Sequence, residues 1–527
     1  MRGLHGWPLI GRVVDPAARR ALVLSGVMAA VFLAAMESTV VATAMPTVIA
    51  SLGGIRIYSW TFSAFLLTST VTMPIWGRLA DQVGRRPAYL AGLTLFLLGS
   101  ASAGLSRSME ELIAFRALQG LGAGSLISIG MTIVGDLYGV ERRAKMQGYF
   151  SGVWGVASLV GPLVGGLLTD RVSWRWVFYI NIPFGLLAAA AIAVGLHDEG
   201  RNRPRVSFDL LGMGVFAAAI SALMVGLVEI GAGESRRPTG IGLIALSAVL
   251  LGLFVLVERR VADPVIPLHL FGNPVLRAAA ATGLLSGMAM FGAITYVPLY
   301  LQAVTGSTAT QAGWVLMPFV LGWVVFSVVG ARLVLRVGYR RVVLAGMTAL
   351  VLAFLLLAGW DESLTRLTAA RDIALAGVGM GLVFVPMLIA VQNSVPRSLL
   401  GSATSLTGFF RTLGGAVGVA VMGAAMTHRL ERALAGVVTT APAELQEALR
   451  WLAAHPDLAV NPITRPTLGE ALLGQMRPVL AHAIGGVFVV GLVIAVAALL
   501  SAFLVPPGQV RDLAVGREPV TPSGTKA

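Results

Sequence analysis

The stretch "GRLADQVGRRP" at residues 77–87 indicates how the chain is organised, because "ARLVLRVGYRR" at residues 331–341 repeats its pattern. Arg78 and Gly84 of the first stretch have the same spacing as Arg332 and Gly338 of the second. Each stretch reads as a short basic loop between two apolar segments, as is usual on the cytoplasmic side of a membrane protein. Two unrelated basic turns remain an alternative, but the match at equivalent places predicts a chain of two related halves.

The apolar segments around these loops are long enough to cross a bilayer. The chain is 56% hydrophobic and 12% charged, whereas soluble domains carry about 25% charged residues. A membrane helix needs roughly 20 apolar residues. Fourteen segments meet this length: 21–46, 57–78, 88–106, 110–137, 146–168, 175–197, 208–231, 239–258, 274–302, 310–336, 341–359, 371–393, 399–427 and 480–505. The pattern excludes a soluble globule.

Lys and Arg residues set the orientation. They concentrate in loops on one side of the predicted spans, which places both termini in the cytoplasm. The net charge of +14 is therefore a property of short loops, and we expect no nucleic-acid partner. The apolar segment after Arg19 and Arg20 is longer than a signal-peptide core, so we interpret it as an uncleaved first helix. The short Arg-rich loops favour the cell (inner or plasma) membrane as the location.

The predicted fold is an all-α polytopic membrane protein with 14 transmembrane helices in two six-helix pseudo-symmetric bundles and two inserted linker helices. Repeats of this kind are common in secondary transporters, with the substrate site near the midplane between the halves. The predicted boundaries are a cytoplasmic N-terminal tail (1–20), an N-terminal bundle (21–197), two linker helices (198–273), a C-terminal bundle (274–505) with an extracytoplasmic segment (428–479), and a disordered cytoplasmic tail (506–527).

Enzyme chemistry finds little support in the sequence. The chain has no Cys and six scattered His, so we predict no thiolate site and no metal site. The patterns "HExxH", "GxSxG" and "GxxxxGK[ST]" are absent from the sequence, which argues against a hydrolase or an ATP-driven machine. We expect no cofactor and a function other than catalysis.

Two charged residues lie inside predicted spans at matching depths. At about 1.5 Å per residue, Glu37 lies about 24 Å from the cytoplasmic surface and Arg116 about 9 Å from the outer one. In a core of about 30 Å these depths nearly coincide. Charges inside a membrane are usually functional. We therefore predict that Glu37 binds protons with Arg116 as its partner, and that Glu37 also serves as the counter-charge for a cationic substrate. A static pair that fixes helix packing is the alternative.

Five motifs resemble the major facilitator superfamily, specifically its fourteen-helix drug:proton antiporter branch. In order they are "GRLADQVGRRP" (77–87), "FRALQGLGAG" (115–124), "GVASLVGPLVGG" (155–166), "WRWVFYINIPFG" (174–185) and "FFRTLGGAVG" (409–418). The resemblance implies an alternating-access transporter whose first and fourth helices face the substrate cavity, which would bring Glu37 and Arg116 together.

The first motif would act as a conformational latch, by the same resemblance. Gly77 is expected to end its helix and let backbones pack closely, and Asp81 to accept bonds from Arg78 or Arg85. The latch would close the cytoplasmic side in one state and open in the other; an ordinary charged turn is the alternative. The predicted latch residues are Gly77, Arg78, Asp81, Gly84, Arg85 and Arg86.

The third motif implies an antiporter helix that packs against the other half and bends. Small residues allow close helix approach, and proline introduces a kink. Its residues are Gly155, Gly161, Pro162, Gly165 and Gly166; generic small-residue packing is the alternative reading.

Candidate substrate contacts are aromatic or charged. We predict Glu37, Tyr58, Phe65, Phe291, Tyr296 and Arg411, with Trp60, Phe319 and Trp323 as further aromatic candidates. The alternative is that the rings face lipid or the membrane interface. Arg411 lies about 18 Å into its helix without an obvious acidic partner, and would bind an anionic group, a distant carboxylate or backbone carbonyls. Glu229 reads as a solvated helix end.

The long outer segment 428–479 includes Leu445, Leu449 and Leu452 at helical spacing, which favours amphipathic helical extensions. It would guide a lipophilic substrate or dock an extracytoplasmic partner, unless it is a passive loop.

The combined prediction is a monomeric, proton-driven exporter of small lipophilic compounds, with cationic ones favoured and the lipid bilayer as its environment. The alternative is an exporter of a dedicated lipid or hydrophobic metabolite.

Overall fold

A computed structural model describes residues 15–137, 140–197, 209–231, 236–261, 264, 268–396, 399–440, 442–454 and 470–507. The first part of the chain forms α1 (Pro16–Leu52), η1 (Ile55–Ile57), α2 (Trp60–Val83), α3 (Arg85–Leu105), α4 (Met109–Leu137), α5 (Val140–Arg171), α6 (Trp176–Tyr179) and α7 (Asn181–Gly195). Two helices follow, α8 (Leu210–Gly231) and α9 (Arg237–Glu258).

The second part forms η2 (Leu268–Gly272), α10 (Pro274–Ala303), α11 (Ala309–Val337), α12 (Tyr339–Ala358), α13 (Arg366–Asn393), α14 (Leu400–Thr440), α15 (Ala443–Ala454) and α17 (Glu470–Ala502). Across the described ranges the regular elements are all helical, as predicted. Long apolar segments adopt helices because a helix satisfies its backbone groups internally, which lipid cannot do.

The helices occupy every range in which the sequence predicts a span. Within the described residues, eleven are long and apolar enough to cross a membrane, so the chain is a multi-pass membrane protein, while the full count of fourteen stays a prediction. One predicted span, 175–197, is divided between α6 and α7. The expectation that Gly77 ends a helix is wrong: α2 continues to Val83, because the turn forms at Gly84 instead.

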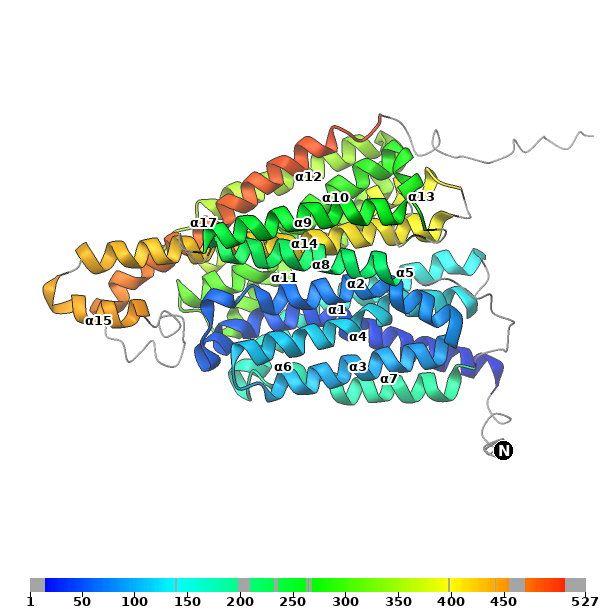
Figure 1. Ribbon diagram of the computed structural model, residues 1–527, viewed down its shortest axis with the longest axis horizontal. Helices are drawn as coiled ribbons and strands as arrows, with labels where there is room; N and C mark the ends of the chain where they lie inside the picture. The colour runs from blue at the N-terminus through cyan, green and yellow to red at the C-terminus, as the bar shows by residue number, and fades with distance from the viewer. Residues whose placement is uncertain are drawn as a thin grey trace, which may run out of the picture.

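The two parts share one packing scheme (Figure 1). In the N-terminal half, α1–α7, α4 packs on α2 and α3, and α1 packs on α5 and α7. In the C-terminal half, α10–α17, α13 packs on α11 and α12, and α10 packs on α14 and α17. Between the halves, α5 packs on α11 and α14 on α2. The cross-contacts therefore also correspond, with the fifth helix of each half on the second helix of the other.

The repeated loop owes its two glycines to backbone geometry. Gly84 (φ 114°) joins α2 to α3, and Gly338 (φ 84°) joins α11 to α12. Side chains with a Cβ rarely adopt such positive φ values, whereas glycine does so at little cost. The recurrence of glycine in the two sequence stretches therefore reflects the same sharp turn in the two halves.

Beyond the bundle, α14, α15 and the start of α17 project at one end, on the left of Figure 1. We call this the α15 end, and the opposite end, where the chain starts, the N-terminal end. In α15, Leu449 and Leu452 are buried and Leu445 is partly buried, as their spacing predicts. Residues 455–469 of the predicted outer segment lie outside the described residues.

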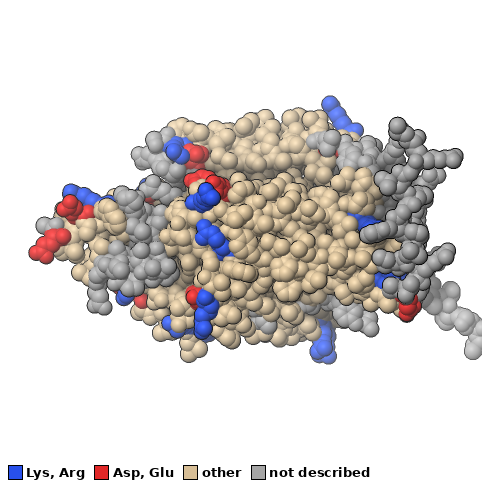
Figure 2. All heavy atoms as spheres, turned by 90° about the horizontal axis from the view of Figure 1, so that it is seen from below, with Lys and Arg blue, Asp and Glu red and all other residues tan. Residues whose placement is uncertain are grey.

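The flank of the bundle is apolar. Figure 2 shows one face whose broad middle is covered by uncharged residues, with Lys, Arg, Asp and Glu towards its two ends. Beyond its first turn, α9 also exposes large apolar side chains: Ile241, Leu246, Val249, Leu253 and Leu256. An exposed apolar belt of this kind is expected where lipid takes the place of water.

Candidate functional site

Glu37 of α1 and Arg116 of α4 form a buried ion pair at the centre of the N-terminal half. Their side chains are 0% and 1% exposed, and Arg116 Nη1 donates to Glu37 Oε1. Arg116 Nη1 also donates to Gln119 Oε1 (2.7 Å), and Nε donates to the carbonyl of Thr61 (3.2 Å). The guanidinium carbon lies 4.2 Å from the centroid of the Phe65 ring. The predicted approach of the two charges is therefore present in the structure.

The second carboxylate oxygen of Glu37 binds a residue that sequence reasoning missed. Asn181 Nδ2, at the start of α7, donates to Glu37 Oε2 (2.7 Å) and to Ser100 Oγ (2.9 Å). Ser100 Oγ in turn donates to the carbonyl of Phe178 (2.8 Å). An amide inside an apolar membrane helix was the available signal, because such polar groups seek partners on neighbouring helices.

Two polar atoms near the Glu37–Arg116 pair do not form a hydrogen bond with any described residue. Gln119 Nε2 and Asn181 Oδ1 are buried without a hydrogen-bond partner among the described residues. A protonated carboxyl becomes a hydrogen-bond donor, and an amide offers both a donor and an acceptor group. The cluster therefore has groups that can accommodate Glu37 in its ionised or its neutral form.

The antiporter motif places α5 between two helices. A Cβ atom at Gly161 or Gly165 would meet the carbonyls of Met36 and Val40 on α1. On another side of α5, a Cβ at Gly166 would meet the backbone of Thr310 on α11, and the carbonyl of Pro162 faces Gly313. α5 therefore contacts α1 of its own half and α11 of the other half.

Hydrogen bonds join the halves near the α15 end. Asp170 Oδ2 at the end of α5 accepts from the backbone N–H of Thr310 (2.8 Å), and Oδ1 accepts from that of Ala309 (3.2 Å). A carboxylate at a helix N-terminus is favoured because unpaired N–H groups point towards it. Gln302 Nε2 also donates to the carbonyl of Thr43 (3.0 Å) across the halves. Asp170 was not predicted, because its partner lies in another helix.

The predicted aromatic contacts separate into two groups. Tyr58 and Tyr296 are fully buried, with ring centroids 5.7 Å apart. Tyr58 donates to the carbonyl of Thr295 (2.7 Å) and Tyr296 to that of Val419 (3.1 Å). Here they belong to the contact between the halves, and their assignment to substrate binding stays a prediction. Phe65 lies against Arg116, and Phe291 packs against Gly415 of α14.

Other aromatic candidates lie in the C-terminal half. Phe319 and Trp323 are neighbours on α11 (6.1 Å between centroids), and Trp323 contacts Phe384 of α13 (6.4 Å). Trp60 is partly buried at the start of α2. Phe384 thereby connects this group to the pocket that contains Arg411.

Four of the six predicted latch residues are described in the structure: Gly77, Gly84, Arg85 and Arg86. The side chains of Arg78 and Asp81 lie outside the described residues. A Cβ atom at Gly77 would meet no described atom within 4 Å, so the described residues show no close packing there. Arg86 is partly buried at the start of α3. The latch itself stays a prediction.

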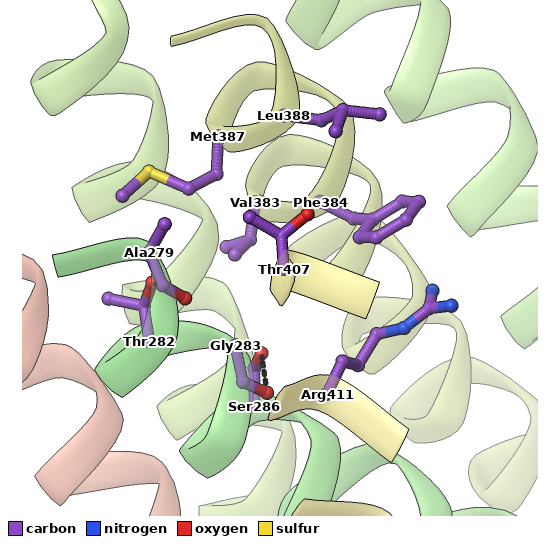
Figure 3. A pocket seen from close by; sticks show the side chains of 10 residues that line it. All are labelled: Ala279, Thr282, Gly283, Ser286, Val383, Phe384, Met387, Leu388, Thr407 and Arg411. Carbon is purple, nitrogen blue, oxygen red and sulfur yellow. Dashed lines mark hydrogen bonds between the residues drawn. The ribbon is translucent and has the colours of Figure 1, made fainter. Parts of the chain in front are cut away.

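Arg411 of α14 lies in a pocket of the C-terminal half, between α10, α13 and α14 (Figure 3). Its guanidinium carbon is 4.1 Å from the centroid of the Phe384 ring.

Glu229 forms a surface pair with Arg236 (3.5 Å; side chains 23% and 63% exposed), in line with the predicted solvated helix end. Within the described ranges no three His, Asp or Glu side chains cluster as metal ligands would.

Comparison with known proteins places the chain in a family. The family model described as Major Facilitator Superfamily matches residues 27–419. The chain is 37% identical to "Multidrug transporter protein MdtP" of Bacillus subtilis (strain 168) over 412 residues, covering 78% of this chain and 76% of that protein. It is 31% identical to "Multidrug resistance protein 3" of the same organism over 499 residues, covering 93% and 96%.

A solved structure shares the fold. It is a bacterial homologue of the human lysosomal transporter Spinster in an inward-facing, unoccupied conformation, with a TM-score of 0.62 and 14% identity, covering 95% of this chain and 99% of that one. The chain belongs to the Major Facilitator Superfamily.

Proposed function

We propose that this protein is a proton-driven antiporter that exports lipophilic compounds, with cationic ones favoured, by alternating access. The observation that carries the proposal is the buried Glu37–Arg116 pair. Buried ion pairs are weak stabilisers compared with apolar residues of similar volume, and charges inside a membrane protein usually serve function. The printed names of the two Bacillus relatives, both multidrug proteins, support drug export.

Fourteen spans in two six-helix bundles, with α8 and α9 between them, form the transporting unit in this proposal. Both termini lie on the cytoplasmic side of the cell membrane, so the α15 end faces outwards. The interhalf hydrogen bonds of Asp170, Gln302 and Tyr58 all lie towards that end. These bonds support a conformation closed to the outside, and the halves rock against each other to open it.

The proton step takes place at Glu37. In the outward-open state a proton from outside adds to a carboxylate oxygen, which removes the negative charge facing Arg116 and weakens the ion pair. Neutral Glu37 then donates a hydrogen bond, for which Asn181 Oδ1 is an acceptor after rotation of its amide. Substrate leaves on the outside in this same outward-open state. Return to the inward-open state and loss of the proton to the cytoplasm then restore the pair, and the next substrate binds.

The energy available is sufficient for useful export. With a cytoplasm-negative potential, inward movement of one proton releases about 2.3 kcal/mol per 100 mV. At about 1.4 kcal/mol per decade, this supports roughly a fortyfold gradient of a neutral substrate. No nucleotide is required.

Export of a dedicated lipid or hydrophobic metabolite is the second candidate function. The observation that favours it is the helical projection at the α15 end, where Trp451 of α15 is 51% exposed. An exposed aromatic ring outside the bundle offers a surface for a lipid tail leaving the outer leaflet. A partner protein there is a further proposal, and the transporter itself is taken as a monomer.

Proteoliposomes containing wild type, Glu37→Gln or Glu229→Gln test the proposal. A pH gradient is imposed with ethidium present, and dye and lumenal pH are followed together. We expect wild type and the Glu229→Gln control to move dye and protons in opposite directions, and Glu37→Gln to move neither. Proton exchange by Glu37→Gln would assign the proton to another carboxylate. If wild type ignores several lipophilic cations, the lipid or metabolite exporter is the better reading.

A further inference from the structure

The pocket around Arg411 is separate from the Glu37 cluster and lies within one half. Its lining comes from three helices of the C-terminal half: α10 supplies Thr282, Gly283 and Ser286, α13 supplies Phe384, and α14 supplies Arg411. Figure 3 shows Arg411 and Phe384 on one side of the opening, and Thr282 with Ser286 on the other. The pocket is partly open and holds about 20 Å³ of space that a water-sized group can reach, so it admits the small head of a ligand while the rest of the ligand lies outside it.

Arg411 supplies the free hydrogen-bond donors of this pocket. Its Nε is buried without a partner among the described residues, and no described carboxylate forms an ion pair with it. The hydroxyls of the lining are already used as donors within their own helices. Thr282 donates to the carbonyl of Ala278 (2.8 Å), Ser286 to that of Gly283 (3.3 Å) and Thr407 to that of Thr404 (2.7 Å).

The stacked geometry leaves the guanidinium ready for a planar anion. A guanidinium that stacks on a ring keeps its N–H groups in the plane, where they match a carboxylate or similar oxyanion two at a time. The rest of the lining is apolar: Ala279, Val383, Met387 and Leu388. Arg411 is partly buried, so its charge keeps part of its hydration, and a ligand anion would supply the counter-charge that the described residues lack.

Two glycines of α10, Gly283 and Gly287, shape the pocket because they carry no side chain. A Cβ at Gly283 would lie 3.7 Å from the carbonyl of Thr407 and 3.9 Å from the amide of Arg411. At Gly287, one turn further, a Cβ would overlap the carbonyl of Arg411. Gly287 thus allows α10 and α14 to approach closely, and Gly283 leaves an opening beside Arg411.

We propose that this pocket binds the acidic group of an amphipathic organic anion or zwitterion, with Arg411 holding a carboxylate-like group and the adjoining carbon skeleton extending out through the open side of the pocket. The inference rests on the proposed function and extends it. The exporter would accept substrates with an acidic group in the C-terminal half, in addition to lipophilic cations near Glu37. Thr282, Ser286 and Thr407 offer acceptor oxygens to a hydroxyl or ammonium group on the same ligand.

The lack of cysteine in the chain permits a direct test. Thr407→Cys places one thiol in the pocket, and its reaction rates with the anionic sulfonatoethyl and the cationic trimethylammonioethyl methanethiosulfonates are compared in nanodiscs. We expect the anionic-to-cationic rate ratio to fall at least tenfold when Arg411→Gln is added. The matched control Arg277→Gln removes an exposed charge from α10 and should leave the ratio within twofold.

Ligand binding is measured as a slower reaction of the Thr407→Cys thiol with the methanethiosulfonate reagents when the ligand is present. Dansylglycine, which carries a carboxylate, should slow labelling at a concentration at least tenfold lower than its methyl ester does. Arg411→Gln should abolish this difference. Arg411→Lys, which keeps the charge without the planar fork, should retain the reagent ratio within threefold and lose most of the preference for the acid.

Three outcomes would overturn the inference: a thiol that neither reagent modifies, a rate ratio that does not depend on Arg411, or equal protection by acid and ester. Size-exclusion profiles show whether Arg411→Gln is folded, and Arg411→Lys carries the protection test if it is not. These measurements use no pH gradient. Failure of proton-coupled transport would therefore leave their result intact, and their failure would leave antiport intact.

Discussion

The two halves of this transporter share a frame but not their buried charges. In α5, Gly155, Gly161 and Gly165 have the same spacing as Gly408, Gly414 and Gly418 in α14. Gly165 packs against Val40 of α1, and Gly418 packs against Met288 of α10. Small residues at equivalent places thus bring the first and fifth helices of each half together.

The charges inside this shared frame differ in kind. In the N-terminal half, Glu37 and Arg116 neutralise each other and bind Gln119 and Asn181. In the C-terminal half, Arg411 stacks on Phe384 and has an unpartnered Nε within the described structure. Glycines at helix contacts serve both halves alike, whereas each half carries its own chemistry.

The largest effect should come from breaking the pair in the N-terminal half. Arg116→Met leaves the Glu37 carboxylate buried without its cation, which costs about 3–5 kcal/mol of stability. The double variant Glu37→Gln/Arg116→Met removes both charges and should regain most of that stability without regaining proton-coupled transport. Thermal unfolding in a mild detergent, together with the dye assay, measures both. If the double variant transports normally, the pair is structural.

Next in size are substitutions at the glycine contacts common to both halves. Gly165→Val and Gly418→Val each place a side chain against a neighbouring backbone and should destabilise by about 1–3 kcal/mol through overpacking. A Cβ at Gly408 meets nothing within 4 Å, so Gly408→Ala is the matched control and should unfold like wild type. A large loss of stability at only one of Gly165 and Gly418 would show that the contacts between the first and fifth helices differ in the two halves.

A smaller effect is expected at the contact between the halves. Asp170→Asn removes the carboxylate charge from the N-terminus of α11 and should weaken closure of the α15 end by about 0.5–1 kcal/mol. The equivalent position in α14 is Gly423, next to Ser59 just before α2, so the other cross-contact lacks this charge. Distances between spin labels on paired cysteines in α5 and α11 should lengthen in the variant. Unchanged distances would show that packing alone holds the end closed.

The smallest effect on stability should come from Arg411. Arg411→Met removes a charge that lacks a protein partner among the described residues, so the free energy of unfolding should change by less than about 1 kcal/mol, in contrast to Arg116→Met. Thermal unfolding of the two variants side by side tests this contrast directly. A loss as large as that of Arg116→Met would reveal a protein partner for Arg411.

Much of the architecture could be predicted from the sequence because its signals are local. A run of apolar residues forms a helix in lipid whatever its neighbours are, and a glycine that needs positive φ is required by the turn itself, as at Gly84 and Gly338. Depth along a helix follows from counting residues, so the approach of Glu37 to Arg116 could be anticipated once their helices were taken as neighbours.

The tertiary structure alone decided which polar groups meet. Asn181 reaches Glu37 across 144 positions of sequence, and Asp170 reaches Thr310 across 140. Gly77 seemed suited to close packing from its type, yet no described atom would lie within 4 Å of a Cβ there. Such contacts depend on the rotation of each helix about its axis and on which helices pack together. Apolar periodicity specifies neither closely in a membrane, because lipid and protein interior are both apolar.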